Sequence, residues 1–235
     1  MKLRSKLMAA MAAIAIATTT ACSDDDNNGS LPSLDGTFQT IVTYEGSNDN
    51  GSSFTVTEPG TDVLTTFTSV KKFPTEGETA LQPGTRVLIF YKNTADKRYQ
   101  SGPIDLRGVS LIFTGEAQAK PQSEISPLRV DYMDVSLAEL SGTYININAR
   151  AAAGTPRVFD IYFDEATVAS EFPQAFVVFE TDSHSARERQ LFGSFDIASV
   201  WDQSTCRGIR LTYMTDDGPE SQTFNKGTQP IRPME

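Results

Sequence analysis

Histidine and cysteine are almost absent from this chain of 235 residues, which contains only His184, Cys22 and Cys206. Zinc sites are built from several His or Cys ligands, so a four-ligand site here would need carboxylates to complete it. The chain also lacks a phosphate-binding Gly-Lys loop, a Gly-x-Ser-x-Gly nucleophile elbow and a dinucleotide-binding glycine fingerprint. We therefore predict no bound metal and no cofactor, and the sequence designates no catalytic residue.

Basic residues are also scarce, with 20 Lys and Arg against 30 Asp and Glu and a formal net charge of −10. Proteins that bind nucleic acid or anionic lipid headgroups concentrate positive charge, so we expect neither class of partner. After residue 21, no window approaches the ~18 uncharged apolar residues of a transmembrane helix. Any attachment to a membrane must then come from another feature.

The first 21 residues have the three-part layout of a secretory signal peptide. Three basic residues precede an apolar run, Leu7 to Ala17, and small residues follow it. The run would be about 16 Å long as a helix, against a hydrocarbon core of about 30 Å, so it is too short for a permanent anchor. The junction resembles the lipobox of bacterial lipoproteins, with Thr19 in place of the usual leucine. The resemblance implies removal of residues 1–21 and contact with the membrane through a lipid on Cys22.

Residues 22–33 are expected to form an acidic, flexible tether, because the run that starts at Ser23 has nothing to bury. Ser23 is followed by Asp24, Asp25 and Asp26, an order that resembles the surface-export signal of Bacteroidetes lipoproteins. The resemblance implies an outer-membrane protein displayed on the cell surface. The alternative is a plain spacer, which leaves the periplasmic face open. Without residues 1–21 the chain keeps 17 basic and 30 acidic residues, a net charge of −13.

The rest of the chain consists of short strand patterns, and a proline-containing change of composition at 117–127 divides it into regions 34–120 and 121–235. In the first region, Asn50-Gly51 predicts a type I′ hairpin. Consecutive apolar residues in Arg86–Tyr91 suit a strand buried on both faces. Five or six short strands are typical of a small OB-like barrel. The predicted strands are 37–44, 53–57, 63–70, 86–91 and 109–114.

In the second region, apolar and polar residues alternate along 144–149 and 158–163, as in an antiparallel sheet with one solvated face. Gly154-Thr155-Pro156 is predicted to turn one strand into the other, and Asp217-Gly218 to form a terminal hairpin. Two stretches, 134–140 and 164–172, have apolar spacings that suit helices of at most two turns. The pattern predicts an antiparallel β-sandwich, with further strands at 174–181, 189–197, 207–215 and 221–224.

The cysteine at the lipobox, the acidic leader, the Leu-x-Pro-Gly turn that opens Gly84–Tyr91 and the C-terminal sheet region together resemble the NigD-like lipoproteins of Bacteroidetes. The resemblance covers nearly the whole mature chain. It implies an OB-like barrel followed by an immunoglobulin-like β-sandwich, and an association with bacteriocin production. It supplies no reaction and no catalytic residue.

Few single residues point to chemistry. His184 lies beside Ser183 and Ser185, but catalytic triads are assembled from separate segments, so a solvated loop explains this stretch better than a general base. Cys206 is expected to be a small buried strand residue rather than a reactive thiol. The Asx-Gly pairs predict hairpin turns in preference to calcium sites. Exposed aromatic residues could contact a sugar or a peptide, although core packing is the commoner fate of such residues; the candidates are Tyr91, Tyr99, Tyr132, Tyr144, Phe192 and Trp201. Trp201, flanked by polar residues, is the first candidate for ligand contact.

Three functions remain open. The first is a non-enzymatic binding module of the cell envelope, with a protein or a glycan as partner. The second is a carboxylate-dependent glycan or peptide hydrolase, which two acids about 5 to 10 Å apart in a cleft, one with a raised pKa, would favour. The third is a structural or immunity partner in a bacteriocin-related envelope complex.

Overall fold

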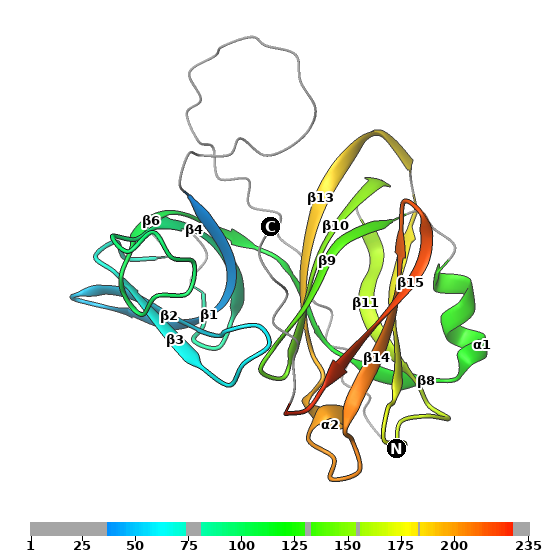
Figure 1. Ribbon diagram of the computed structural model, residues 1–235. Coiled ribbons are helices and arrows are strands. Elements are labelled where there is room, and N and C mark those ends of the chain that lie inside the picture. Colours follow the sequence, from blue (N-terminus) through cyan, green and yellow to red (C-terminus); the bar gives the residue numbers. More distant parts are fainter. Residues whose placement is uncertain (1–36, 74–80, 130–132, 154–155, 183, 228–235) are drawn as a thin grey trace, which may run out of the picture. The chain divides into compact units, whose positions relative to one another are not determined.

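A computed structural model describes residues 37–73, 81–129, 133–153, 156–182 and 184–227. The predicted all-β class is confirmed, because the described strands form three hydrogen-bonded sheets and the described helices are single turns (Figure 1). The signal peptide, Cys22 and the expected export residues Ser23 to Asp26 lie outside the described residues. No helix in the described ranges is long and apolar enough to cross a membrane.

The first sheet has six strands in the order β5-β3-β2-β1-β4-β6. Neighbours pair antiparallel except β3 and β5, which are parallel. Phe54, Phe67 and Tyr91 are enclosed in its core. The predicted burial of 86–91 on both faces is confirmed, since only Phe90 is partly exposed. The strands are β1 (Phe38–Asn48), β2 (Gly51–Thr57), β3 (Leu64–Ser69), β4 (Arg86–Lys92), β5 (Gly102–Pro103) and β6 (Asp105–Leu111).

The predicted hairpin at Asn50-Gly51 forms, but the prediction of a type I′ turn is wrong. A type I′ turn needs positive φ at both central residues. The loop residues are Asp49 and Asn50, and positive φ, 119°, falls on Gly51 after the loop. A Cβ on Gly51 would lie 1.7 Å from the carbonyl oxygen of Ser69, so the close approach of β3 requires glycine there. The terminal hairpin repeats this arrangement, with φ of 114° at Gly218.

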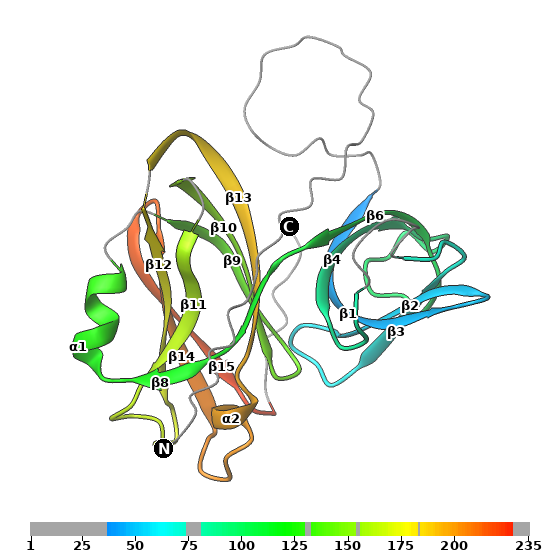
Figure 2. The ribbon, with the colours of Figure 1, turned by 180° about the vertical axis from the view of Figure 1, so that it is seen from behind.

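The chain leaves the first sheet at Ile112. The predicted strand 109–114 is therefore two strands: β6 ends in the first sheet, and β7 (Phe113–Glu116) pairs in parallel with β13 of the second. Figure 2 shows the chain running from β6 to β8 and on to α1. The chain thus changes sheet at Ile112, inside the predicted strand 109–114. The domain boundary expected after residue 120 stays a prediction.

The second sheet has the order β7-β13-β10-β9, and the third has the order β15-β14-β12-β11-β8. Both contribute to one core, in which Ile145 and Ile147 of β10 meet Ile161 and Phe163 of β11. The predicted alternation is confirmed for the apolar side of both strands, but the opposite side is not simply solvated, because Asn146 and Tyr162 on it are also buried. The remaining strands are β8 (Gln118–Lys120), β9 (Asp134–Ser141), β10 (Tyr144–Ala153), β11 (Pro156–Asp164), β12 (Gln174–Thr181), β13 (His184–Asp196), β14 (Gly208–Thr215) and β15 (Gly218–Asn225).

Successive strands β10 and β11 lie in different sheets, so Gly154-Thr155-Pro156 does not join them as a hairpin. Residues 154–155 themselves lie outside the described residues. The sequence predicts a hairpin because both strands alternate apolar and polar residues. Their apolar sides instead face each other across the core, because β10 pairs with β9 and β13 whereas β11 pairs with β12 and β8.

Both helix predictions are wrong, since 134–140 lies in β9 and 164–172 forms the end of β11 and turns. Helical turns occur instead at the predicted change of composition and after β13. The first pair covers the third sheet, where Ile125 packs on Tyr162 and Val178. These elements are α1 (Gln122–Ile125), η1 (Ser126–Arg129) and α2 (Ala198–Trp201).

Candidate functional site

The first and second sheets contact each other through side chains outside their own cores. Ile41 of β1 and Leu88 of β4 pair across the first sheet and are not part of its core cluster. They are nevertheless only 9% and 3% exposed. Both contribute to a surface shared with Asn146 and Ile147 of β10. This side of the first sheet is therefore covered by the second sheet.

Arg86 is the centre of the polar part of this contact. Its Nε donates to Ser194 Oγ at 2.9 Å and its Nη2 donates to Asn146 Oδ1 at 3.1 Å. Its Nη1 donates to Thr43 Oγ1 at 3.0 Å, and its Cζ lies 4.4 Å from the centre of the Tyr144 ring. Burial lowers the pKa of Arg86 to about 10, against the opposing attraction of Tyr144 and Asp196. Each guanidinium nitrogen is bonded, as burial of a cation requires.

A second contact lies at the β9–β10 turn. Ser141 Oγ donates to the carbonyl oxygen of Thr57 at 2.6 Å. Gly142 next to it has φ of 62°, and a Cβ there would approach Thr57 Oγ1 to 3.2 Å. The Arg86 cluster and the Ser141–Thr57 bond therefore connect the first and second sheets at two separate places.

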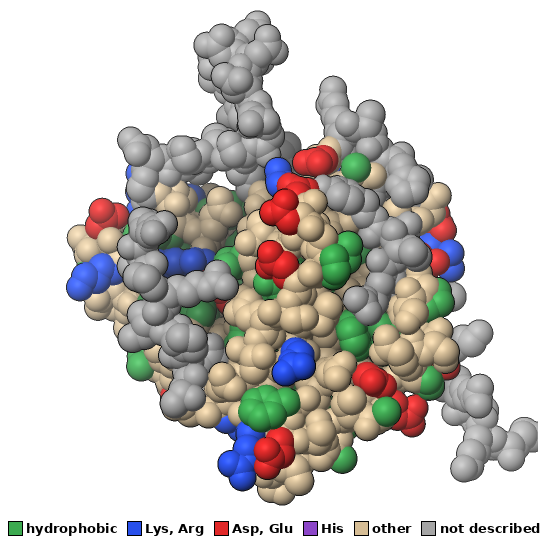
Figure 3. All heavy atoms as spheres, turned by 45° about the vertical axis from the view of Figure 1, so that its right-hand side comes forward, with side chains coloured by type: hydrophobic (Ala, Val, Ile, Leu, Met, Phe, Trp, Pro, Cys, Tyr) green, Lys and Arg blue, Asp and Glu red, His purple; other side chains and the backbone are tan. Residues whose placement is uncertain are grey.

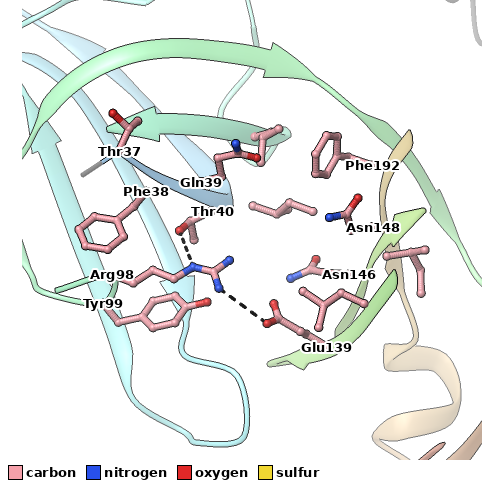
Figure 4. A pocket seen from close by; sticks show the side chains of 14 residues that line it. Thr37, Phe38, Gln39, Thr40, Arg98, Tyr99, Glu139, Asn146, Asn148 and Phe192 are labelled. Atoms are coloured by element: carbon pink, nitrogen blue, oxygen red, sulfur yellow. Dashed lines mark hydrogen bonds and ion pairs between the residues drawn. The ribbon is translucent and has the colours of Figure 1, made fainter. Parts of the chain in front are cut away.

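A pocket of about 410 Å³ lies between the same two faces (Figure 4). Most of its lining comes from strands β1, β4, β9, β10 and β13, which gives it a rigid frame, whereas Arg98 and Tyr99 come from the loop between β4 and β5. Polar, charged and aromatic side chains share the lining, which is the usual mixture of a small-molecule site. The lining residues are Thr37, Phe38, Gln39, Thr40, Ile41, Leu88, Arg98, Tyr99, Leu137, Glu139, Asn146, Ile147, Asn148 and Phe192.

Arg98 and Glu139 lie opposite each other across the pocket (Figure 4). Arg98 Nη1 is 3.9 Å from Glu139 Oε1, which is longer than a hydrogen bond. Arg98 Nε donates to Thr40 Oγ1 at 3.3 Å, and the Arg98 carbonyl oxygen accepts from the Tyr91 hydroxyl. The Nη atoms donate no hydrogen bond within the described residues. Beside them, burial raises the pKa of the Tyr99 hydroxyl above its usual range, so it stays protonated.

Two asparagine side chains present their N–H groups to the pocket. Asn146 Oδ1 accepts from Arg86 and from Ser194 Oγ, the latter at 2.8 Å, which fixes its Nδ2 as the free end. Asn148 Oδ1 accepts from Gln190 Nε2 at 2.9 Å, with the same consequence. Both Nδ2 atoms point toward the pocket centre in Figure 4. The pocket thus has two preset donors on one strand.

Thr37 adds a polar atom that needs a partner. Its Oγ1 is buried and has no hydrogen-bond partner among the described residues. A buried hydroxyl without a partner is destabilising by about 1 to 3 kcal/mol. Although Thr37 lines the pocket, its Oγ1 is directed away from the pocket centre in Figure 4, so it is not one of the groups that face a ligand.

A carboxyl group with a raised pKa occurs elsewhere. Burial raises the pKa of Asp160 on β11 to about 6, although the Ile161 N–H and Lys120 favour its charged form. Asp160 Oδ1 accepts from Ile161 N at 2.8 Å. Asp160 is not among the pocket residues, which include a single acid, Glu139. The arrangement expected of a hydrolase, two acids sharing the cleft, is not present in the lining.

No family model matches the chain, and no curated protein matches its sequence. Solved structures do match its fold. A protein of unknown function from Bacteroides vulgatus aligns with a TM-score of 0.61 and 13% identity over 84% of this chain and 96% of its own. A NigD-like immunity protein from Bacteroides caccae aligns with a TM-score of 0.55 and 16% identity, over 87% of this chain and 100% of its own.

A candidate lipoprotein from Bacteroides fragilis aligns with a TM-score of 0.53 and 11% identity, over 83% of this chain and 100% of its own. The chain has the fold of these Bacteroides proteins. The predicted resemblance to NigD-like lipoproteins is confirmed at the level of the fold.

Of the residues singled out from the sequence, Tyr99 and Phe192 line the pocket, whereas Trp201, Cys206 and His184 are not among its lining residues. Trp201 on α2 is half-buried against the sandwich core, with Lys226 Nζ 5.3 Å from its ring centre, and its role in ligand contact stays a prediction. Cys206 is buried as expected, but it lies before β14 rather than in a strand, and its Sγ donates to the Gly208 carbonyl oxygen at 3.4 Å. His184 opens β13 instead of lying in a loop, and its side chain is outside the described ones.

The rest of the described surface offers weaker candidates. On the side that carries β14 and β15, hydrophobic side chains are scattered singly and do not gather in a patch (Figure 3). Among the described residues, no group of three or more His, Cys, Asp or Glu side chains is placed to hold a metal ion. The pocket is therefore the best-supported site. The alternation along β10 places Asn146 and Asn148 on one side of the strand, but it does not show that the first sheet covers that side.

Proposed function

We propose that this protein is a non-enzymatic binding module of the bacterial cell envelope and that the pocket between the first and second sheets is its binding site. The observation that carries the proposal is the lining: Asn146 and Asn148 present N–H groups of fixed orientation beside Arg98, whose Nη1 makes only a long ion pair of 3.9 Å with Glu139. Groups held in advance in this way reduce the entropy lost on binding.

The proposal includes the address of the protein. Residues 1–21 are removed, a lipid on Cys22 holds the chain at the outer membrane, and Ser23 to Asp26 direct it to the cell surface. Support comes from the fold shared with Bacteroides proteins, one of them described as a candidate lipoprotein. Replacing Cys22 with Ser should release the protein from the membrane fraction, and retention would contradict the anchor. Replacing all three aspartates with Ala should reduce protease accessibility on intact cells.

The proposal also includes a finer architecture. The first sheet is an OB-like barrel, and the second and third sheets are an immunoglobulin-like sandwich, with the two domains meeting at Ile112. The change of pairing between β6 and β7 and the separate core of each part support this division. In this arrangement the binding site lies between domains, where ligand pockets are common.

A variant that fills the pocket tests the binding function. Leu137 lines the pocket and is half-buried, so Leu137→Trp places an indole in the space a ligand would use. Leu64→Trp is the matched control, because Leu64 is 62% exposed and does not line the pocket. Envelope extract, separated into polysaccharide and protein fractions, should raise the Tm of the full-length wild type and of Leu64→Trp, but not that of Leu137→Trp.

If no fraction raises any Tm, or if Leu137→Trp responds like the wild type, the proposed function is wrong. New reducing ends or new amino termini in the active fraction would instead support the hydrolase. That alternative has less support, because the pocket lining contains one acid whereas glycosidases pair two.

A second candidate function follows from the NigD-like immunity protein that shares the fold. In that case the partner is another envelope protein in a bacteriocin-related complex. Co-purification of one such protein with wild type, Leu64→Trp and Leu137→Trp alike would favour this function, because a protein interface extends well beyond one pocket.

A further inference from the structure

The gap between Arg98 and Glu139 matches a group that both donates and accepts hydrogen bonds. The two facing atoms are 3.9 Å apart. A ligand oxygen about 2.8 Å from each of them would subtend an angle of about 90°, which a hydroxyl group tolerates. That hydroxyl accepts from Arg98 and donates to Glu139. A carboxylate cannot donate and is repelled by Glu139, while an ammonium cannot accept and is repelled by Arg98.

The remaining polar groups suit several oxygen atoms of one uncharged ligand. Nδ2 of Asn146 and Nδ2 of Asn148 are donors spaced two residues apart on one strand, so they lie on the same side of it. Sugar hydroxyls meet all these needs, since each one both donates and accepts.

Aromatic side chains supply the apolar part. Phe38, Tyr99 and Phe192 line the pocket and are all half-buried (Figure 4). Phe38 and Tyr99 also pack against the core of the first sheet, so Phe192 is the ring most open to a ligand. Large flat rings with a polar surrounding bury the C–H faces of sugar rings at little conformational cost. A purely hydrophobic ligand would leave the N–H groups of the pocket without partners.

We propose that the pocket binds a neutral oligosaccharide, with a hydroxyl between Arg98 and Glu139, further oxygens on Asn146 and Asn148, and sugar faces against the aromatic rings. The inference rests on the proposed function and names its ligand class. Acidic glycans are disfavoured both by Glu139 and by the net negative charge of the chain.

Isothermal titration calorimetry on the full-length protein, in a detergent without a sugar headgroup, tests the ligand class. The neutral probes are tetrasaccharides of glucan, mannan, xylan and galactan. The charged probes are tetragalacturonate, which is acidic, and a chitosan tetramer, which is basic. We expect at least one neutral probe to bind and both charged probes to bind more weakly or not at all.

Matched variants locate the binding. Phe192→Ala should raise the Kd of the neutral probe about tenfold by removing a ring contact. Phe172→Ala should leave it unchanged, because Phe172 is 40% exposed and does not line the pocket. Asn148→Asp keeps the shape and the bond from Gln190 but replaces the donor by a charged acceptor, so it too should weaken binding about tenfold.

Each contrary result has its own meaning. Preferred binding of a charged probe that Phe192→Ala weakens overturns the neutral-sugar inference but leaves the proposed binding function standing. The same holds if no sugar binds while an envelope fraction still raises the Tm of the wild type and not of Leu137→Trp. Sugar binding that is equal in wild type, Phe192→Ala and Asn148→Asp overturns the pocket as the site. Circular dichroism of each variant separates these outcomes from misfolding.

Discussion

Arg86 and Arg98 lie at the same contact between two sheets, yet their surroundings differ in kind. Arg86 is 5% exposed, and all three of its guanidinium nitrogens donate to oxygen atoms of the protein. Arg98 is partly exposed, bonds through Nε alone and faces Glu139 across a gap. Full satisfaction of the first indicates a structural connection, whereas the Nη donors of the second, which make no hydrogen bond within the described residues, support the proposed ligand site.

The largest effect on stability should come from replacing Arg86, because all its guanidinium nitrogens donate hydrogen bonds. Arg86→Met removes one of the two donors to Asn146 Oδ1 and the arginine donors to Ser194 and Thr43, so the free energy of unfolding should fall by about 3 kcal/mol. Urea denaturation measures this loss. Arg210→Met is the control, because Arg210 is exposed on β14, and it should change stability by less than about 0.5 kcal/mol. Equal losses in both variants would contradict the structural role of Arg86.

Asp160 on β11 is a partly buried acid whose partners do not offset the effect of burial on its charge. Its pKa is about 6 in the folded protein, against an ordinary value of 3.8. The folded state therefore keeps a proton that the unfolded state releases, and the free energy of unfolding should fall as pH rises from about 4 to about 6. Because the group is partly solvated, we expect a fall of about 2 kcal/mol.

Denaturation at a series of pH values checks this fall. Asp160→Asn keeps the size and the ability to accept from Ile161 N–H but cannot titrate, so its profile should be flatter across that window. An equally steep profile in Asp160→Asn would assign the pH dependence to other acids.

Substitutions of Asn146 and Asn148 on β10 should separate an effect on stability from an effect on ligand binding. Asn146→Ala removes the acceptor of Arg86 Nη2, so it should lower the free energy of unfolding by about 2 kcal/mol and also weaken ligand binding. Asn148→Ala breaks only the partly exposed bond from Gln190, so stability should fall by about 0.5 kcal/mol while binding weakens to a similar degree. Parallel denaturation and calorimetry measure both quantities. A similar loss of stability in the two variants would mean that the Arg86 cluster is less important than its geometry indicates.

The sequence predicted most strands because alternation and β-branched runs are local signals. It failed on 134–140 for a physical reason. The helix prediction rests on Val135, Leu137 and Leu140. A bulge in β9 opposite the Asn148–Ala149 step interrupts the alternation, so that Val135 and Leu140 share the core while Leu137 lines the pocket on the other side. Residues 134–140 form a strand because they pair with β10, and a local sequence pattern does not contain this long-range pairing.

The pocket was beyond the reach of sequence patterns. Thr40, Arg98 and Glu139 come from a strand, a loop and another strand separated by about forty residues or more, and only the packing of two sheets brings them together. Trp201 was selected for its polar neighbours in sequence, but its ring packs on a core that those neighbours do not reveal. Sequence alternation placed Asn146 and Asn148 on one side of their strand but did not show which sheet would cover that side.

The smallest effect on stability should accompany one of the largest effects on binding. Arg98→Gln removes a long, partly solvated ion pair with Glu139, so the free energy of unfolding should change by less than about 0.5 kcal/mol. Binding should weaken about tenfold, because glutamine is shorter and uncharged and does not reach the ligand oxygen. A double-mutant cycle with Glu139→Gln, measured by denaturation and by calorimetry, sharpens the contrast. Coupling in binding without coupling in unfolding is expected if the ligand itself joins the two side chains. Coupling in unfolding alone would make Arg98 a second structural arginine and remove the difference from Arg86 on which the choice of this pocket depends.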